Sequence, residues 1–468
     1  MKKIVLFGAG VYAKKYKSLL DYLGIEFDCF SDNDSNKHGT TLYGKKVIPP
    51  RKLIDLDCRI IISCTHGEQI RKQLEEMGIA GKLLELNDIY DLFKKKVISE
   101  NGYGCQLSEK ENVIVDMYEG IGWGGTEIWA ATVAKGLADK ERRVTLFGST
   151  EQVRLNQQYE VLVERFSNEN TIGQMVKSMV AKLPFVLINN FAGCAYLAAV
   201  MLKMQYQEKV HIIDVIHNDN ISLFNAHMIF RDWTDCFLCV SDKIRKRIIQ
   251  EYHIEIGKTY FKEQPIDVDA DYVRHYTELQ VPLRIGYAAR LVKQQKRADL
   301  FPELINTLEK AGINYQLDIA GDGEYYSYIE RFVQENKLGT KVKLLGRINK
   351  TGMSDFWKKQ DVYLNFSEYE GTSLSMLEAM SYACVPVVTD VSGVSEFVKD
   401  GINGYVCQCG DFGRIAEDIK ELENNRNLLK NFGEICRKEI LNRCKKENYI
   451  NFMCKMIDGI TNDKTAEL

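Results

Sequence analysis

The chain has 468 residues, of which 45% are apolar and 27% are charged, and its formal net charge is −3. These proportions indicate a soluble globular protein of about three domains, and the small net charge argues against bulk binding of nucleic acid. No apolar run is long enough to span a bilayer, and the chain begins with a strand–turn pattern rather than a signal peptide, so we expect a cytoplasmic protein.

Short apolar strands alternate with helical patterns along nearly the whole chain, which predicts an α/β protein with parallel sheets covered by helices. The pattern divides into three units, at residues 1–105, 106–277 and 278–468, and the last unit ends in helices that we expect to pack back on the body. The 13 cysteines lie mostly inside apolar segments, as buried thiols do, and no second pair complements CFLC at 236–239 with zinc-finger spacing.

In the first unit, FGAGVYA at residues 7–13 follows a strand and begins a helix, which matches the G-x-G-x-x-A pattern of a dinucleotide-binding turn. Asp32 follows the second strand, where an acidic residue can meet a ribose. Gly8, Gly10 and Asp32 are therefore candidate nucleotide-binding residues. A structural or docking module is an equal alternative, because tight turns need glycine even where nothing binds. A nicotinamide oxidoreductase would need a catalytic constellation that the other units lack.

In the second unit, EGIGWGGTE at residues 119–127 places glycine-rich backbone before a helix. Gly124 and Gly125 would let main-chain N–H groups approach a phosphate or sugar oxygen at the positive end of that helix. A simple turn would need fewer glycines and would not require Trp123 among them. His217 ends an apolar strand, where open α/β sheets bind ligands, although a lone histidine can equally be structural.

In the third unit, Arg290 directly follows a strand and Lys296 comes six residues later. Fixed cations at this position could neutralise a diphosphate leaving group. Lys293 and Arg297 lie beside them, so a solvated basic loop is the alternative.

The segment EYEGTSLSMLEAMSYACVPVVTD, residues 368–390, predicts a loop, a buried helix and a buried strand. Glu378 is the only charged residue from Leu374 to Thr389, and Glu370 precedes the helix. Helical rise separates the two carboxylates by up to about 12 Å. That exceeds the separation of about 5 Å in a retaining glycosidase. It suits two carboxylates that hold opposite ends of one ligand, with the helix N-terminus between them, and a nucleotide sugar has this layout.

The spacing E-x7-E in EGTSLSMLEAM resembles the nucleotide-sugar site of family 4 retaining glycosyltransferases. These have the GT-B fold, in which two Rossmann-like domains face a cleft. ARLVKQQKR, IAGDGEYY, VKLLGRI, GWGGTE and CVSDKIRKRI follow the order and spacing of that family over residues 110–450. The match departs at KEQPIDVD, where P-N-G is usual, and at the Thr-Ser after Glu370–Gly371, where Phe-Gly is common. These departures leave the identity of the sugar open.

The resemblance implies a role for each candidate residue. Glu378 would bind the ribose, Glu370 the transferred sugar, and Arg290 and Lys296 the diphosphate, while His217 would lie beside the reacting face of the sugar. Arg290, Lys296, Glu370 and His217 are thus the expected catalytic residues. The expected donor-binding residues are Glu378, Gly371, Thr372, Ser373, Leu374, Gly124, Gly125, Gly346 and Arg347.

The resemblance also implies an activity, the transfer of a hexose from a nucleotide sugar to a hydroxyl acceptor with retention of configuration and without a metal. A UDP-sugar is the favoured donor and a GDP-sugar the second candidate. The acceptor would be a glycan, a lipid-linked molecule or a protein, in the synthesis of a cell-surface polysaccharide or glycoconjugate. DKIRKRIIQ and FKKKV could contact the inner face of the membrane. A non-catalytic partner subunit that regulates or positions another transferase is the alternative.

Residues 1–100 resemble the small Rossmann module at the front of some sugar acyltransferases, through FGAGVYA, CFSDND and LYGKKVIPP. That module contributes to nucleotide-sugar binding in the acyltransferases. No left-handed β-helix repeat accompanies it here, so the resemblance leaves its ligand open. The expected architecture is therefore a GT-B protein preceded by a third, small Rossmann-like domain.

Overall fold

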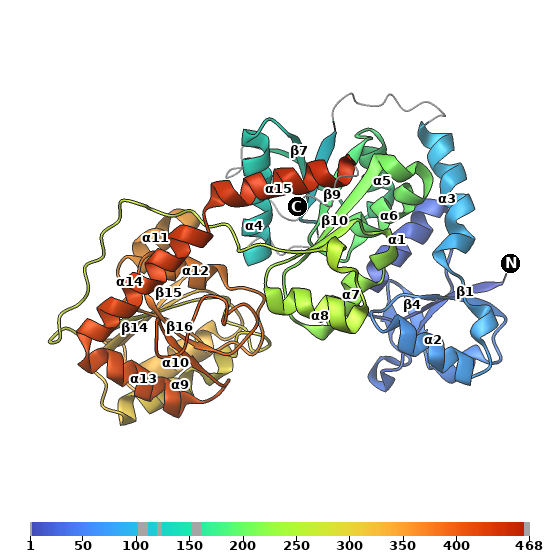
Figure 1. Cartoon of the computed structure of the whole chain (residues 1–468). Helices are drawn as coiled ribbons and strands as arrows, with labels where there is room; N and C mark the ends of the chain where they lie inside the picture. The colour runs from blue at the N-terminus through green and yellow to red at the C-terminus, as the bar shows by residue number, and fades with distance from the viewer. Residues whose placement is uncertain (1, 102–110, 119–123, 151–160, 463–468) are drawn as a thin grey trace.

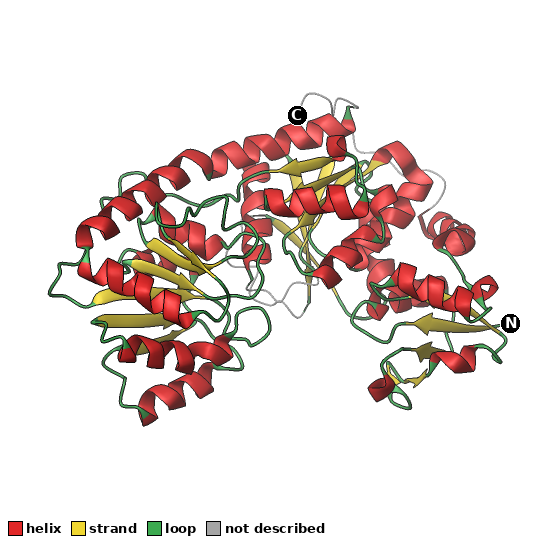
Figure 2. Cartoon of the chain, turned by 60° about the horizontal axis from the view of Figure 1, so that its bottom comes forward, coloured by secondary structure: helices red, strands yellow, loops and turns green. Residues whose placement is uncertain are grey.

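The structure, a computed structural model, describes residues 2–101, 111–118, 124–150 and 161–462. Figure 2 shows three sheets, each flanked by helices, which confirms the α/β architecture expected from the sequence. The strands are short runs rich in Val, Ile and Phe. Central strands such as β9 (Phe185–Asn189) and β17 (Val385–Thr389) are buried along their whole length, as parallel strands covered on both faces must be.

The first sheet has the order β3-β4-β2-β1-β5, and its strands are parallel except in the β3–β4 pair. Its elements are β1 (Lys3–Phe7), α1 (Ala13–Leu23), β2 (Cys29–Ser31), β3 (Thr41–Leu42), β4 (Lys45–Ile48), β5 (Cys58–Ile62), α2 (Gly67–Glu76) and α3 (Leu86–Asn101).

The second sheet has the order β12-β11-β10-β9-β6-β7-β8 and is parallel throughout. Besides β9, its elements are β6 (Asn112–Asp116), α4 (Gly125–Asp139), β7 (Arg143–Ser149), β8 (Leu162–Phe166), α5 (Thr171–Val180), α6 (Cys194–Tyr206), β10 (Val210–Ile216), α7 (Ile221–Met228), β11 (Cys236–Cys239), α8 (Asp242–Tyr252) and β12 (Thr259–Phe261).

The third sheet has the order β15-β14-β13-β16-β17-β18 and is also parallel. Besides β17, its elements are β13 (Leu283–Ala288), α9 (Phe301–Lys310), β14 (Tyr315–Ala320), α10 (Tyr326–Glu335), β15 (Val342–Gly346), α11 (Lys350–Trp357), β16 (Val362–Asn365), α12 (Leu374–Ser381), β18 (Tyr405–Cys407), α13 (Phe412–Asn424), α14 (Arg426–Arg443) and α15 (Lys446–Thr461).

The last helix, α15, leaves the third sheet and lies against α4 of the second (Figure 1). Its apolar face joins the core of the second sheet through Ile450, Met453 and Ile457. The side chain of Tyr449 accepts a hydrogen bond of 3.0 Å from Nε1 of Trp129 on α4. The end of the chain therefore ties the second and third sheets together.

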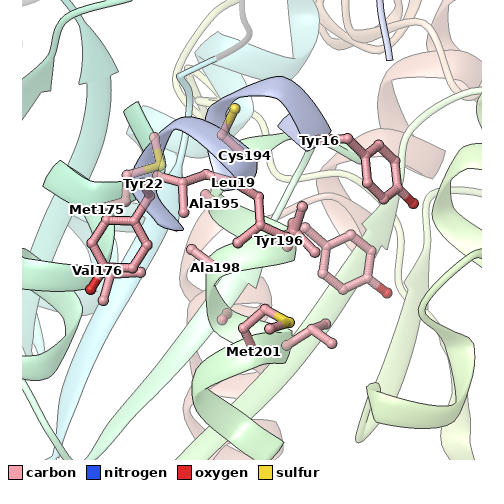
Figure 3. Close-up of a cluster of buried hydrophobic side chains, with 14 of the residues drawn as sticks. Tyr16, Leu19, Tyr22, Met175, Val176, Cys194, Ala195, Tyr196, Ala198 and Met201 are labelled. Atoms are coloured by element: carbon pink, nitrogen blue, oxygen red, sulfur yellow. The ribbon is translucent and has the colours of Figure 1, made fainter. Parts of the chain in front are cut away.

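The first sheet shares a hydrophobic core with the second. Helix α1 packs against α5 and α6, and Figure 3 shows Leu19 and Tyr22 of α1 beside Met175 of α5 and Ala195 of α6. Most of α6 is buried because α1 and α5 cover the side of the helix that does not face the sheet.

The unit boundaries near 105 and 277 stay predictions. Within the described residues, no helix combines the length and the hydropathy needed to cross a membrane.

Candidate functional site at the facing sheet edges

The strand ends of the second and third sheets meet through direct hydrogen bonds. Thr372 Oγ1 donates to the main-chain oxygen of Val240 at 2.7 Å, and the hydroxyls of Ser241 and Ser392 lie 2.9 Å apart. In both sheets the segments concerned follow the carboxyl ends of parallel strands, where open α/β sheets bind ligands. The candidate residues of both units are thus brought to one place.

Gly371 and His217 are in contact at this junction. A Cβ atom on Gly371 would overlap with the main-chain oxygen of His217, so only glycine allows the loop after β16 to approach the end of β10 this closely. The sequence placed these two residues 154 positions apart in different units. Their meeting fixes how the two sheet edges face each other.

The first turns of α4 and α12 also approach each other. A Cβ on Gly125 would lie 3.6 Å from Cδ1 of Leu374, and Gly124 precedes α4 in an extended conformation. Ser373 is the N-cap of α12, and its hydroxyl accepts the N–H of Met376. Helix N-termini attract anions, and here two of them lie next to each other. Trp123 of the same loop lies outside the described residues.

Lys296 and Glu370 form an ion pair that is nearly buried, with side-chain exposures of 12% and 9%. Gln295 completes the arrangement, because its Nε2 donates to Glu370 Oε2 at 3.2 Å and its Oε1 accepts from Arg290 Nη2 at 3.2 Å. Three predicted catalytic residues are thereby linked through Gln295, which the sequence analysis did not single out. Gln295 has a left-handed backbone (φ 48°), a strained conformation typical of functional loops.

Glu378 lies on the second turn of α12 and is partly exposed, although the residues on either side of it are buried. Helix α12 is held to the end of β13 because Ser375 Oγ donates to the main-chain oxygen of Ala288 at 3.1 Å. The apolar run around Glu378 therefore packs in the core, while Glu378 itself is only partly buried.

Gly346 is the last residue of β15 and Arg347 follows it, beside the loops after β13 and β14. The main-chain N–H of Gly321 donates to the oxygen of Gly346 at 2.8 Å, and a Cβ on Gly321 would overlap with the oxygen of Ala289. Arg347 lies 3.9 Å from Asp322 in an exposed ion pair. The loops of three neighbouring strands are thus packed against one another.

His217 is held by two neighbours in the second unit. Its Nε2 lies 2.7 Å from Asn190 Oδ1, and Trp129 packs edge-on against its ring at a centroid distance of 4.9 Å. Burial, with a smaller contribution from nearby His227, lowers the pKa of His217 to about 3. The imidazole is therefore neutral at physiological pH.

The turn residues of the first sheet also come together. Gly8 has a φ of 116°, and a Cβ there would lie 2.6 Å from Cβ of Cys64. Asp32 Oδ2 accepts from the main-chain N–H of Ala9 at 2.7 Å and from Lys37 Nζ at 3.0 Å. Burial raises the pKa of Asp32, but hydrogen bonds from main-chain N–H groups and Lys37 outweigh it and lower the pKa overall. The carboxylate is thus already bound to the turn.

A surface pocket of 610 Å³ in this unit lies at the opposite edge of the sheet, lined by Lys3 and Lys46 among others. Nucleotide binding by Gly8, Gly10 and Asp32 stays a prediction.

Each of the two aspartates in the KEQPIDVD segment lies in an ion pair with a lysine. Asp267 lies 3.8 Å from Lys446, and Asp269 lies 3.3 Å from Lys358. In the described ranges, His, Cys, Asp and Glu do not gather in a group of three that could hold a metal ion.

Comparison with known proteins finds family models that match two parts of the chain. Residues 278–439 match the model of the family described as "Glycosyl transferases group 1", and residues 1–84 match that described as "C2185-like, N-terminal". The chain is 21% identical, over 74% of its own length and 97% of the relative, to the N-acetyl-alpha-D-glucosaminyl L-malate synthase of Bacillus anthracis. It is 29% identical, over 36% of its length and 33% of the relative, to the poly(ribitol-phosphate) alpha-N-acetylglucosaminyltransferase of Staphylococcus aureus.

A solved structure with the same architecture is Anabaena HepE in complex with UDP and glucose. It superposes with a TM-score of 0.63 and 14% identity, over 75% of this chain and 100% of that one. The second and third sheets therefore have the GT-B fold, preceded by an additional sheet at the N-terminus.

Proposed function

We propose that the protein is a retaining glycosyltransferase of family 4, which transfers a hexose from a nucleotide sugar to a hydroxyl acceptor. A UDP-sugar is the favoured donor. The observation that carries the proposal is the convergence of the Lys296–Glu370 pair, Arg290 and two helix N-termini at the junction of the two GT-B sheets. The match to Glycosyl transferases group 1 and the UDP and glucose of HepE support it.

In this proposal the diphosphate binds between the first turns of α4 and α12, near Arg290 and Lys296. Breaking the anomeric C–O bond develops negative charge on the diphosphate, and these fixed cations and main-chain N–H groups stabilise that charge. Glu370 binds hydroxyls of the sugar and Glu378 those of the ribose. The base lies against the loops that contain Gly346 and Arg347.

The acceptor enters from the second sheet, on the side of His217, and the sugar keeps its anomeric configuration. The catalytic step that we propose needs no metal. The named relatives support a role in building a cell-surface polysaccharide or glycoconjugate, since one of them glycosylates poly(ribitol phosphate).

The first experiment is a thermal-shift screen with UDP, GDP, ADP and their common sugars. A nucleotide at a hundred times its dissociation constant adds about 2.7 kcal/mol of stability, which is easily measured. We expect one base to stabilise the protein and Glu378→Ala to remove that effect. Glu368→Ala is the matched control, because Glu368 is an exposed carboxylate on the same segment. If no nucleotide stabilises the folded protein, the proposed function is wrong.

Retention is tested separately on the product. With the nucleotide sugar found in the screen and an alkyl glycoside or glycerol phosphate as acceptor, the anomeric proton coupling of the product should match that of the α-linked donor. A product of inverted configuration would exclude the retaining mechanism while leaving the transferase assignment intact.

A non-catalytic partner subunit is not favoured, because Arg290, Lys296 and Glu370 are not only present but joined in one network. Attraction to an anionic membrane should be weak at α8, since Lys246 pairs with Asp242 there. Arg247 on the same helix pairs with Asp219 and Glu251.

A further inference from the structure

Asn190 lies at the centre of a hydrogen-bonded chain across three neighbouring strand ends of the second sheet. It follows β9 directly, between the ends of β6 and β10, and only 3% of it is exposed. Its Nδ2 donates to the main-chain oxygen of Asp116 at 2.9 Å, and its Oδ1 lies 2.7 Å from His217 Nε2. No role was expected for this residue from the sequence.

The partners of Asn190 decide which way its amide points. The oxygen of Asp116 is a main-chain carbonyl and can only accept, so the NH₂ group of Asn190 must face it. The amide oxygen therefore faces His217 and requires a donor there. A neutral imidazole has one N–H, and this contact places it on Nε2.

The other ring nitrogen is then an acceptor. Nδ1 accepts no hydrogen bond from the residues that the structure describes, and His217 as a whole residue is of intermediate burial. Because Nδ1 is bonded to Cγ, it lies near the main chain of His217, and that main chain contacts Gly371 at the junction of the sheets. A sugar hydroxyl bound at the junction could donate to it.

We propose that Asn190 is a positioning residue that fixes His217 as the Nε2–H tautomer, so that Nδ1 accepts a hydrogen bond from a hydroxyl of the bound sugar. The second half of this inference rests on the proposed function, and the first half does not. Two features keep the ring in place and neutral. Trp129 packs against the imidazole and donates a hydrogen bond to Tyr449 of α15. The lowered pKa of His217 keeps its imidazole unprotonated above about pH 4.

The tautomer is read directly from the full-length protein by NMR of ¹⁵N- and ¹³C-labelled histidine. The chain has seven histidines, and His217→Gln assigns the signal of interest by removing it. We expect wild-type His217 to be Nε2-protonated and neutral from pH 5 to 8. In Asn190→Leu, which cannot accept from Nε2, the signal should shift toward the Nδ1–H form, whereas Asn190→Asp keeps an acceptor and should preserve Nε2–H. An Nδ1–H signal in the wild type would overturn the proposal.

The role in sugar binding is read by adding ligands to the same sample. The nucleotide sugar selected by thermal shift should move the Nδ1 signal of His217, and the nucleotide alone should not. Asn190→Leu should lower kcat/KM about tenfold, the cost of one hydrogen bond, whereas Asn190→Asp should retain more of the activity. An unmoved Nδ1 signal with the sugar bound would overturn this half. Failure of the proposed function is seen separately, as absence of binding and turnover in the wild type.

Discussion

Lys296 and Glu370 illustrate, at the scale of single residues, how the same contact can serve stability and catalysis. Their side chains are almost withdrawn from water, so each charge depends on the other. Removing one side chain leaves the charge of the other buried without a counter-charge, which destabilises the fold. A loss of activity in such a variant could then result from unfolding rather than from a lost catalytic group. An experiment on this pair has to separate the two effects.

Lys296→Ala should lower kcat by about 10²–10³, because one charge that stabilises the leaving group is lost. It should also reduce stability by about 3 kcal/mol, because Glu370 is left unpaired. Adding Glu370→Gln should recover most of the stability and none of the activity. Lys293→Ala, with a side chain that is 61% exposed, is the control and should change neither. Steady-state kinetics and urea unfolding of the four proteins measure both quantities. Wild-type turnover in Lys296→Ala would exclude the leaving-group role.

Glu111 precedes β6 and is partly buried, and burial raises its pKa to about 7 in the folded protein. The unfolded value is near 4.5, so the folded protein holds its proton more tightly and loses stability as the pH rises from about 4.5 to 7. Glu111→Gln removes the charge at nearly constant volume. It should stabilise the protein at pH 8 by about 1–2 kcal/mol after allowance for partial exposure, and hardly at pH 4.5.

Melting temperatures of wild type and Glu111→Gln at both pH values test this sign. Glu76→Gln changes an exposed glutamate and should have little effect at either pH. An equal gain at pH 4.5 and pH 8 would mean that the substitution acts through something other than ionisation.

The sequence predicted Arg290, Lys296 and Glu370 as site residues because their positions after strands and before a helix are local features. Gln295 and Asn190 were not predictable in the same way. Each is an ordinary amide in the sequence, and its importance arises from partners 75 and 27 positions away. Long-range hydrogen bonds of this kind leave no local pattern.

At the scale of elements, the packing of α4 against α15 depends on a glycine inside a helix. Gly136 lies within α4, near its C-terminal end, and inside a helix alanine is normally favoured over glycine by roughly 1 kcal/mol. A Cβ at this position would overlap with Cδ1 of Ile450 on α15. The glycine is therefore explained by the close approach of the two helices, which the sequence alone did not indicate.

Gly136→Ala should accordingly destabilise the protein by about 1–3 kcal/mol, because Ile450 or the helix must shift to make room for the new methyl group. This is the opposite of what the higher helix propensity of alanine alone would give. Ile450→Ala removes the overlapping atoms, although the loss of a buried side chain destabilises the protein by itself. In a protein that already carries Ile450→Ala, the substitution Gly136→Ala should be neutral or stabilising. Urea unfolding of the double-mutant cycle measures this coupling. Additive effects would show that the two helices do not meet as closely as the structure indicates.

At the scale of the whole molecule, the N-terminal unit packs tightly against the second sheet. Lys15 of α1 is 2% exposed, donates to the main-chain oxygen of Ala192 at 2.8 Å and lies 4.9 Å from the ring of Phe230. The sequence of α6 is apolar along most of its length, but nothing in it indicates that a helix about 180 residues earlier in the chain covers it. The first and second sheets therefore share a hydrophobic core, whereas the third sheet is joined to the second by the hydrogen bonds of Thr372 and Ser392 and by α15.

This arrangement predicts which parts of the molecule unfold together. Lys15→Met keeps the apolar stem but leaves the oxygen of Ala192 without its donor, and should cost about 1–3 kcal/mol. Because α1 and α6 share a core, amide hydrogen exchange should accelerate in both helices by a similar factor, while β13 and β14 of the third sheet stay protected. Lys17→Met removes an ion pair within α1, with Asp21, and should leave exchange unchanged. Faster exchange in α1 alone would mean that the N-terminal unit unfolds independently of the second sheet. The unit would then be a separate module rather than part of a shared core.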